Sequence, residues 1–292
     1  LQDEPIRIFR GGPELPVDQR WDGRTTTGEI VEDGEYGAVF TVIYRKGDVA
    51  VDRLAGPVLI DTIYPTFDVE AAYLLFSPDG DGRRDVIEVS HRTEIEDEWH
   101  VELRASNGTI VRQLTVRNGI LADLTWDGTD ERGDPVPDGE YFYRVRGSDR
   151  AGNVATVELP PIQVDRRLSA AWMFVDRPAF SPNGDGVGDE LIFELRVTPE
   201  IELASWELFI SDSEGVPVRN FGGFGETRFP LTLGWRGNNN VGQRVIDGEY
   251  EATFQAAYTK GDVAEVTVGS LVVDTMPPTI SVGTQYLSLI HI

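Results

Sequence analysis

Residues 126–141 read WDGTDERGDPVPDGEY, and this stretch occurs in three versions along the 292-residue chain. The other two versions begin at Trp21 and Trp235, and each ends in the same tetrapeptide, Asp-Gly-Glu-Tyr. The offset from the tryptophan to the aspartate of that tetrapeptide is 12 residues in all three copies. Chance does not hold three such offsets fixed, so the chain contains internal repeats, and these decide the fold.

A glycine-punctuated motif opens the repeats. Phe-Ser-Pro-Asp-Gly-Asp-Gly at 76–82 recurs as Phe-Ser-Pro-Asn-Gly-Asp-Gly at 180–186, a spacing of 104 residues. The tail reads Leu-Ser-Leu-Ile-His-Ile and resembles the translation of a sequencing-library adaptor. We therefore predict five segments: the last part of a truncated repeat at 1–61, whole repeats at 64–165 and 166–274, the start of a further repeat at 275–286, and a non-native tail at 287–292.

Alternating hydrophobicity predicts that each repeat is an antiparallel β-sandwich. Trp99, Val101 and Leu103 alternate with polar residues, which is typical of a strand with one buried and one solvated face. Seven short strands in about 100 residues indicate an all-β, tandem immunoglobulin-like (fibronectin III-like) fold. The predicted strands of the first whole repeat lie at 72–76, 86–93, 98–105, 110–117, 121–126, 140–148 and 154–164.

The repeated aromatic residues are predicted to have structural roles. The tryptophans fill the core between the sheets, since large aromatic residues are mostly buried. Each tyrosine begins the penultimate strand after an Asp-Gly turn, which is the place of a tyrosine corner, whose hydroxyl bonds to upstream backbone. These residues are Trp21, Trp126, Trp235, Tyr36, Tyr141 and Tyr250.

The motifs together resemble bacterial Ig-like repeats. Each repeat begins with the motif F-S-P-[DN]-G-D-G-x-x-D, and the motifs W-D-G and D-G-E-Y follow in its second half. These motifs resemble those of the Ig-like domain of the flagellar hook-capping (FlgD) family and of the gliding-motility C-terminal domain family. The resemblance covers residues 1–280 and implies an extracytoplasmic setting in a large periplasmic or surface protein of a diderm bacterium. It implies no catalytic activity. The gliding-motility type is usually one terminal copy, whereas this chain holds at least three.

The glycine-rich motif also carries oxygen ligands at regular spacing. Carboxylate and amide oxygens stand at relative positions 1, 3 and 7 in both copies, as in the first half of a calcium-binding EF-hand loop, although the twelfth position does not match. The alternative is a loop of Asx turns that needs no ion. The predicted metal ligands are Asp79, Asp81 and Asp85 in one copy and Asn183, Asp185 and Asp189 in the other.

The place of the loop in the sandwich suggests a role for calcium. The loop follows the first strand, so it should lie at the pole where the last strand leaves the domain, beside Asp165. We hypothesise that Ca²⁺ stiffens the joint between repeats, with Asp165 and Asp274 as additional ligands.

Composition and motifs argue against several classes of function. The formal net charge of −24 argues against nucleic acids and anionic membranes as partners. There is no cysteine, and no apolar run approaches the ~20 residues of a membrane span. His91 and His100 fall on the polar phase of strands and are expected to be exposed. No catalytic motif is present, so the chain is predicted not to be an enzyme.

The sequence therefore predicts non-catalytic spacer repeats of a bacterial extracytoplasmic or cell-surface protein, whose partners are the neighbouring Ig-like repeats of the same chain. Two alternatives stay open. One is an adhesion or carbohydrate-binding module with a protein or glycan ligand, which an exposed row of aromatic residues would support. The other is an accessory region of a secreted enzyme or a flagellar-type scaffold.

Overall fold

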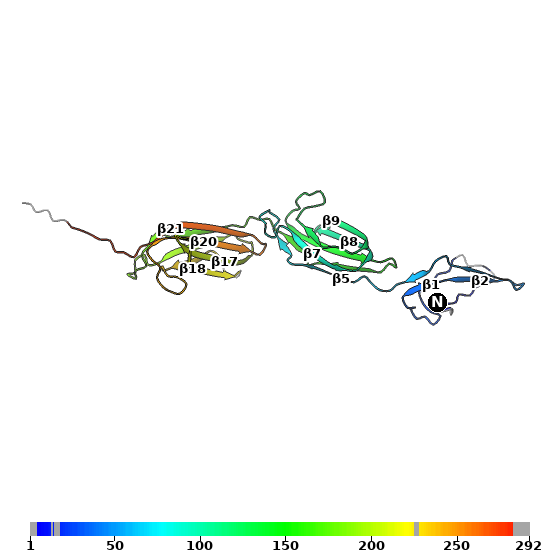
Figure 1. Ribbon diagram of the computed structural model, residues 1–292. Coiled ribbons are helices and arrows are strands. Elements are labelled where there is room, and N and C mark those ends of the chain that lie inside the picture. The colour runs from blue at the N-terminus through cyan, green and yellow to red at the C-terminus, as the bar shows by residue number, and fades with distance from the viewer. Residues whose placement is uncertain (1–4, 13, 15–17, 225–227, 283–292) are drawn as a thin grey trace, which may run out of the picture. The chain divides into compact units, whose positions relative to one another are not determined.

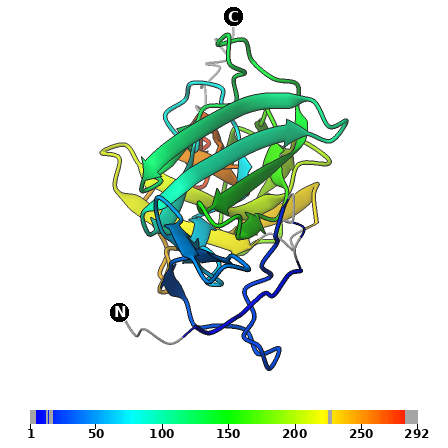
Figure 2. The same ribbon diagram turned by 90° about the vertical axis from the view of Figure 1, so that its right-hand side faces the viewer.

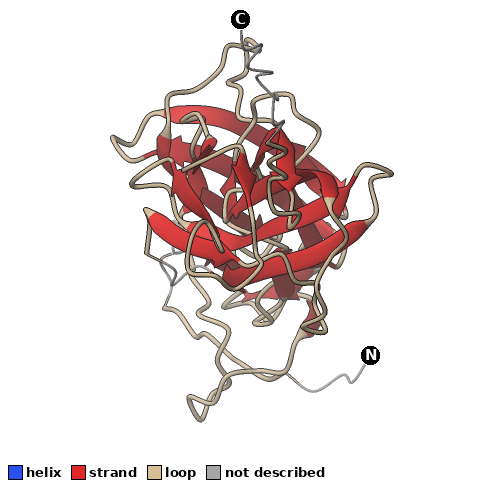
Figure 3. Ribbon diagram, turned by 90° about the vertical axis from the view of Figure 1, so that its left-hand side faces the viewer, coloured by secondary structure: helices blue, strands red, loops and turns tan. Residues whose placement is uncertain are grey.

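The computed structural model describes residues 5–12, 14, 18–224 and 228–282. These residues form strands, turns and loops, and no helix occurs among them (Figure 3). The predicted all-β fold class is therefore confirmed. A helix long and apolar enough to cross a membrane is likewise absent from the described ranges. The predicted tail at 287–292 and the last residues of the segment 275–286 lie outside them.

The chain divides into two compact units. The first unit comprises Leu1–Ala72, Glu88–Val136 and Glu140–Ile162. The second comprises Tyr73–Ile87, Pro137–Gly139 and Gln163–Ile292. The repeat boundaries read from the sequence, near residues 61, 165 and 274, stay a prediction.

Residues before position 61 form only two small ladders. β1 (Gly34–Tyr36) pairs with β4 (Val58–Ile60), and β2 (Val39–Ile43) pairs with β3 (Val49–Arg53), all antiparallel. Val31, which is 7% exposed, is the one buried hydrophobic residue among the described positions 5–61. Two-stranded ladders of this kind do not bury enough surface to be stable alone.

Residues 67–164 form two sheets of antiparallel strands with one parallel pair (Figure 1). The smaller sheet has the order β10-β7-β5 and the larger the order β6-β13-β11-β8-β9, with β12 also paired to β11. The long strands β8 and β9 (blue-green) curve side by side in Figure 2. The strands are β5 (Phe67–Ala71), β6 (Leu75–Phe76), β7 (Ile87–Thr93), β8 (Glu96–Ala105), β9 (Ile110–Gly119), β10 (Leu124–Trp126), β11 (Gly139–Ser148), β12 (Val154–Glu158) and β13 (Ile162–Val164).

Residues 171–273 repeat this pattern. The smaller sheet has the order β14-β16-β19 and the larger the order β15-β21-β20-β17-β18. One continuous hydrophobic core fills the space between them, and Trp235, Phe193 and Phe254 are fully buried in it. The strands are β14 (Ala171–Val175), β15 (Ala179–Phe180), β16 (Leu191–Val197), β17 (Leu203–Asp212), β18 (Pro217–Phe224), β19 (Leu231–Trp235), β20 (Gly248–Tyr258) and β21 (Val263–Val273).

Two predicted strands differ from the structure. The first strand of the repeat is β5 at Phe67–Ala71, whereas most of the predicted strand at 72–76 is a turn that leads into the two-residue β6. The predicted strand at 154–164 is two strands, β12 and β13, because Pro160 and Pro161 interrupt it. Proline lacks the N–H that a ladder needs and therefore ends pairing there.

Candidate functional site

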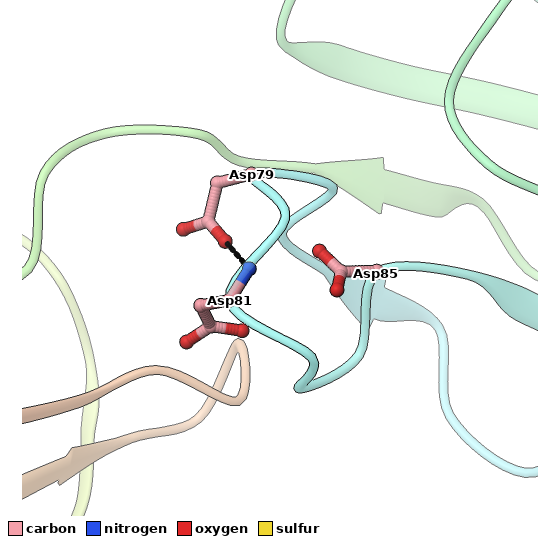
Figure 4. A group of neighbouring side chains, drawn as sticks. All are labelled: Asp79, Asp81 and Asp85. Atoms are coloured by element: carbon pink, nitrogen blue, oxygen red, sulfur yellow. Dashed lines mark hydrogen bonds between the residues drawn. The ribbon is translucent and has the colours of Figure 1, made fainter.

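The acidic loop of the second unit closes on Asp85. The two carboxylate oxygens of Asp85 each accept one backbone hydrogen bond, from Gly80 N and Gly82 N, both at 2.7 Å. Asp79 Oδ1 accepts from Asp81 N at 3.1 Å, drawn as the dashed line in Figure 4. Three carboxylates thus converge on one loop, with ligand oxygens of Asp79, Asp81 and Asp85 within 4.8 Å of one another.

The second loop has the same hydrogen-bond pattern. Asp189 accepts from Gly184 N at 2.6 Å and from Gly186 N at 2.8 Å. These backbone donors hold the pKa of the Asp189 carboxyl below its usual range, because they stabilise the charged form. Asn183 Oδ1 accepts from Asp185 N at 2.9 Å. Both loops are therefore closed by side chain-to-backbone bonds, which leave further carboxylate lone pairs for a hard cation.

Asp165 lies beside the first loop, where the strand order predicted it. Its backbone N donates to Phe76 O at 3.1 Å, next to the parallel pair of β6 and β13. Its carboxylate, however, accepts two hydrogen bonds from the Arg167 guanidinium, one from Nε at 2.9 Å and one from a second nitrogen at 2.7 Å. The Arg167 side chain keeps the pKa of the Asp165 carboxyl low. The carboxylate is thus occupied by a guanidinium, and a metal-ligand role for Asp165 or Asp274 stays a prediction.

The repeated tryptophans and tyrosines make the same contacts in each copy. Every tryptophan donates its Nε1 hydrogen to the carbonyl three residues later, at 2.8–2.9 Å. Every tryptophan also lies edge-on to the tyrosine, with ring centroids 5.0–5.4 Å apart. Tyr36 and Tyr250 donate their hydroxyls to carbonyls four residues upstream. These residues are Trp21, Trp126 and Trp235, with Tyr36, Tyr141 and Tyr250.

The Asp of the Asp-Gly-Glu-Tyr turn has a role that the sequence reasoning missed. Its carboxylate accepts the backbone N–H of the residue that follows each boundary aspartate, at 2.9–3.0 Å. The signal in the sequence was the nearly equal separation of the two positions, which is 29 residues in the first copy and 28 in the other two. The pairs are Asp33 with Thr62, Asp138 with Arg166 and Asp247 with Thr275. We call these three contacts the exit clamps.

The expectation that His91 is exposed was wrong. His91 shares the inward phase of β7 with Ile87 and Val89, is 9% exposed, and its Nε2 lies 2.9 Å from the Tyr143 hydroxyl. Burial lowers the pKa of the His91 imidazole. His100, by contrast, stands on the partly exposed phase of β8 and contacts Glu102 at 3.0 Å. The prediction was wrong because it placed His91 on the solvent-facing side of its strand only on the ground that histidine is polar.

Two exposed aromatic residues were also missed. Trp172 and Phe174 of β14 are 44% and 51% exposed, while Met173 between them is buried. The Arg196 guanidinium lies over the Phe174 ring, 5.3 Å from its centroid. The corresponding positions of β5, 104 residues earlier, carry Asp68 and Glu70. The sequence Ala-Trp-Met-Phe-Val at 171–175 is apolar throughout, so it does not alternate and does not indicate which side chains face solvent.

Comparison with solved structures shows similarity to tandem β-sandwich proteins. A tetra-tandem repeat from the extending region of a large adhesion protein is 15% identical over 86% of this chain, with a TM-score of 0.30. This chain spans 59% of the length of that structure. The fibronectin(III)-like modules of Clostridium thermocellum CbhA are 11% identical, over 74% of this chain and 100% of that one, with a TM-score of 0.40.

A third similar structure comes from a 1.5-MDa bacterial ice-binding adhesin. It is 14% identical over 74% of this chain and 67% of its own, with a TM-score of 0.36. Comparison with family profiles and with curated proteins yields no match. These similarities concern the fold alone.

Proposed function

We propose that this chain is a non-catalytic spacer region of an extracytoplasmic or cell-surface protein, of the bacterial Ig-like repeat type. The observation that carries the proposal is the set of exit clamps. Each one fixes the chain just after the last strand of a repeat by a solvent-exposed backbone hydrogen bond to Asp33, Asp138 or Asp247. A spacer needs short, constrained connections, because a flexible linker would let neighbouring domains collapse together.

Charge supports the same function. The net charge of −24 makes neighbouring parts of such a chain repel one another and keeps it soluble. Asp138 adds an ion pair to its clamp, since the Arg166 guanidinium lies 3.2 Å from its carboxylate. Constrained exits and self-repulsion both favour an extended protein.

Small-angle X-ray scattering of the full chain tests the proposal. We expect Asp138→Ala to increase flexibility and broaden the distance distribution, while Asp134→Ala, a matched acidic change in an exposed hairpin outside the clamp, leaves it unchanged. An unaltered scattering profile in Asp138→Ala, with the fold intact by circular dichroism, would contradict the clamp as a spacer device.

Calcium stiffening is a separate proposal. The convergence of three carboxylates at Asp79, Asp81 and Asp85 supports it, and so does the repetition of the loop at Asn183, Asp185 and Asp189. The Asx-turn bonds close both loops without an ion, so this proposal depends on the titration described in the Discussion.

The exposed pair Trp172 and Phe174 favours a second candidate function, glycan binding on the outer face of β14. Aromatic rings flanked by Arg196 and Glu194 offer a stacking platform with polar groups at its edge. Binding to an array of bacterial and host glycans that is lost in Trp172→Ala would support it. Phe40→Ala, which truncates another exposed aromatic residue, is the control.

A further inference from the structure

Strands β8 and β11 of the first unit carry a groove on the outer face of their sheet. The two strands pair antiparallel, and their alternate side chains point away from the core, because successive residues of a strand face opposite sides. The groove has a volume of about 270 Å³. Three of its five lining residues are arginines, although the chain as a whole has a net charge of −24. The lining residues are His100, Glu102, Arg104, Arg144 and Arg146.

The carboxylate in the groove is already paired. Glu102 Oε1 lies 3.0 Å from His100 Nε2, and Glu102 Oε2 accepts a hydrogen bond from Arg104 Nε at 2.8 Å. The other ring nitrogen of His100 lies 3.1 Å from the hydroxyl of Thr115 on β9. One wall of the groove is therefore a hydrogen-bonded network in which the charge of Glu102 is compensated by Arg104.

Arg144 and Arg146 form the other wall and have no such partner. Both side chains are exposed, and they stand two residues apart on β11, so they lie on the same face of the sheet. Among the residues that the structure describes, neither guanidinium forms a hydrogen bond or an ion pair. Glu158 stands opposite Arg144 on β12 without pairing with it. Two neighbouring guanidiniums are therefore free to bind an anion.

The second sandwich fills the same face with neutral side chains. Counted from the repeated tyrosines, the positions of Arg144 and Arg146 are taken there by Thr253 and Gln255. Gln255 donates a hydrogen bond to Glu265 of β21 at 2.6 Å, and the Thr253 hydroxyl bonds to that of another threonine of β21 at 2.9 Å. A sandwich of this type thus needs no arginine at either position, so the pair in the first unit is not explained by the fold.

The chemistry of the groove suits a small ligand that carries a carboxylate and hydroxyl groups. Guanidinium N–H donors match the two oxygens of a carboxylate, and Glu102 keeps lone pairs that can accept from a hydroxyl. None of the five lining side chains is aliphatic, whereas protein interfaces centre on large, buried anchors. The volume is close to the ~300 Å³ lower end of ligand pockets, which fits a single sugar ring.

We propose that this groove binds an acidic sugar residue, with its carboxylate between the Arg144 and Arg146 guanidiniums and its hydroxyls against the His100–Glu102 wall. The net charge of −24 repels a polyanion at long range, so the ligand is a glycan with isolated acidic residues rather than a densely charged one. The inference depends neither on the spacer function nor on the exposed aromatic pair of β14.

NMR titration of the full chain tests the proposal with three matched probes. Glucuronate carries a carboxylate and hydroxyls, glucose carries only hydroxyls, and acetate carries only the carboxylate. The side-chain Nε–Hε resonances of the arginines report contacts at each guanidinium. We expect glucuronate to shift those of Arg144 and Arg146 and to bind about tenfold more tightly than acetate, while glucose leaves them unchanged.

Two results of this titration overturn the proposal. One is the absence of a shift at Arg144 and Arg146 with glucuronate at about 50 mM. The other is equal affinity for glucuronate and acetate, which would show that the groove recognises only a negative charge.

Matched variants separate the groove from general charge effects. Arg144→Gln and Arg146→Gln should each weaken glucuronate binding about tenfold, since each removes charge-assisted hydrogen bonds. Arg92→Gln removes an exposed arginine of β7 in the same unit and should leave binding unchanged. Equal weakening by Arg92→Gln, or tighter binding of a tetraglutamate peptide than of glucuronate, overturns the sugar ligand. All three arginines are exposed, so these variants are expected to fold normally.

Discussion

Lys260 Nζ lies 2.8 Å from the Asp262 carboxylate, and the two side chains are 0% and 9% exposed. A buried ion pair is costly to break from one side, because the remaining charge is left without a partner. We expect Lys260→Ala to lower the free energy of unfolding by about 3–5 kcal/mol in urea denaturation. Lys46→Ala, in the exposed Lys-Gly-Asp turn at 46–48, should cost less than about 1 kcal/mol. Equal effects of the two substitutions would contradict the role of burial.

Gly147 permits close packing of Trp99. A Cβ added at Gly147 would lie 2.5 Å from Trp99 Cζ3, and the two residues are register partners on β11 and β8. We expect Gly147→Ala to destabilise the fold by about 1–3 kcal/mol, since the buried indole cannot move without strain. Gly119→Ala is the control, because its Cβ would meet nothing closer than 3.7 Å. A Gly147→Ala protein as stable as the wild type would show that the indole repacks freely.

His91 should make stability depend on pH in the mildly acidic range. Its pKa is lowered in the fold, so the unfolded chain binds a proton at His91 more readily than the folded one does. This contribution to stability is complete above the unfolded pKa of about 6.5 and is lost as pH falls from there through the folded pKa. We expect urea unfolding of His91→Gln to show a flatter slope between pH 7.5 and pH 5.5 than wild type. A slope in His91→Gln that equals or exceeds that of wild type would refute the argument.

Calcium binding is tested by calorimetric titration and thermal melting of the full chain. We expect about two ions per chain and a melting temperature that is higher in calcium than in chelator, since a ligand that binds only the folded state stabilises it. Asp79→Ala should remove one ion, and Asp134→Ala should remove none. The absence of both heat and a melting shift would leave the loops as Asx turns.

Limited proteolysis should act first on residues 5–61. The strands β2 and β3 are almost wholly exposed, and Phe40, Ile43 and Val51 are each more than half exposed. Segments that bury little apolar surface open with little free energy and are cut early. We expect trypsin to cleave at Lys46 or Arg53 well before Arg144 of β11. First cleavage between residues 67 and 273 would contradict this expectation.

Local sequence patterns were enough to predict the fold class and most strands. Alternation in β8 and β11 reports directly which side chains face the core, because successive side chains of a strand point to opposite faces. The fixed spacing of Trp21, Trp126 and Trp235 from their tyrosines reflects a contact that each repeat makes within itself. The first strand, Phe67–Ala71, was missed although its sequence Phe-Asp-Val-Glu-Ala alternates. The strand was predicted instead at 72–76, where the residues are mostly apolar.

The candidate sites depended more on tertiary structure. The spacing of Asp79, Asp81 and Asp85 predicted one loop with converging oxygens, because all three lie within seven residues. The exit clamp between Asp138 and Arg166 joins residues 28 positions apart, and only the folded sandwich brings them together. Whether Trp172 and Phe174 or their neighbour Met173 faces outward was likewise decided by the pairing of β14 with β16.

The sequence by itself determined that this chain builds repeated β-sandwiches, because strand alternation, turn glycines and aromatic spacing act over a few residues. Only the tertiary structure decided the environments of identical local sequences. The turns at 46–48 and 260–262 share three residues and one backbone conformation, yet Lys46 is exposed and Lys260 is fully buried. The burial of Lys260 depends on contacts with residues distant in sequence, such as Ser77 and Asp165. A local sequence pattern carries no information about such contacts.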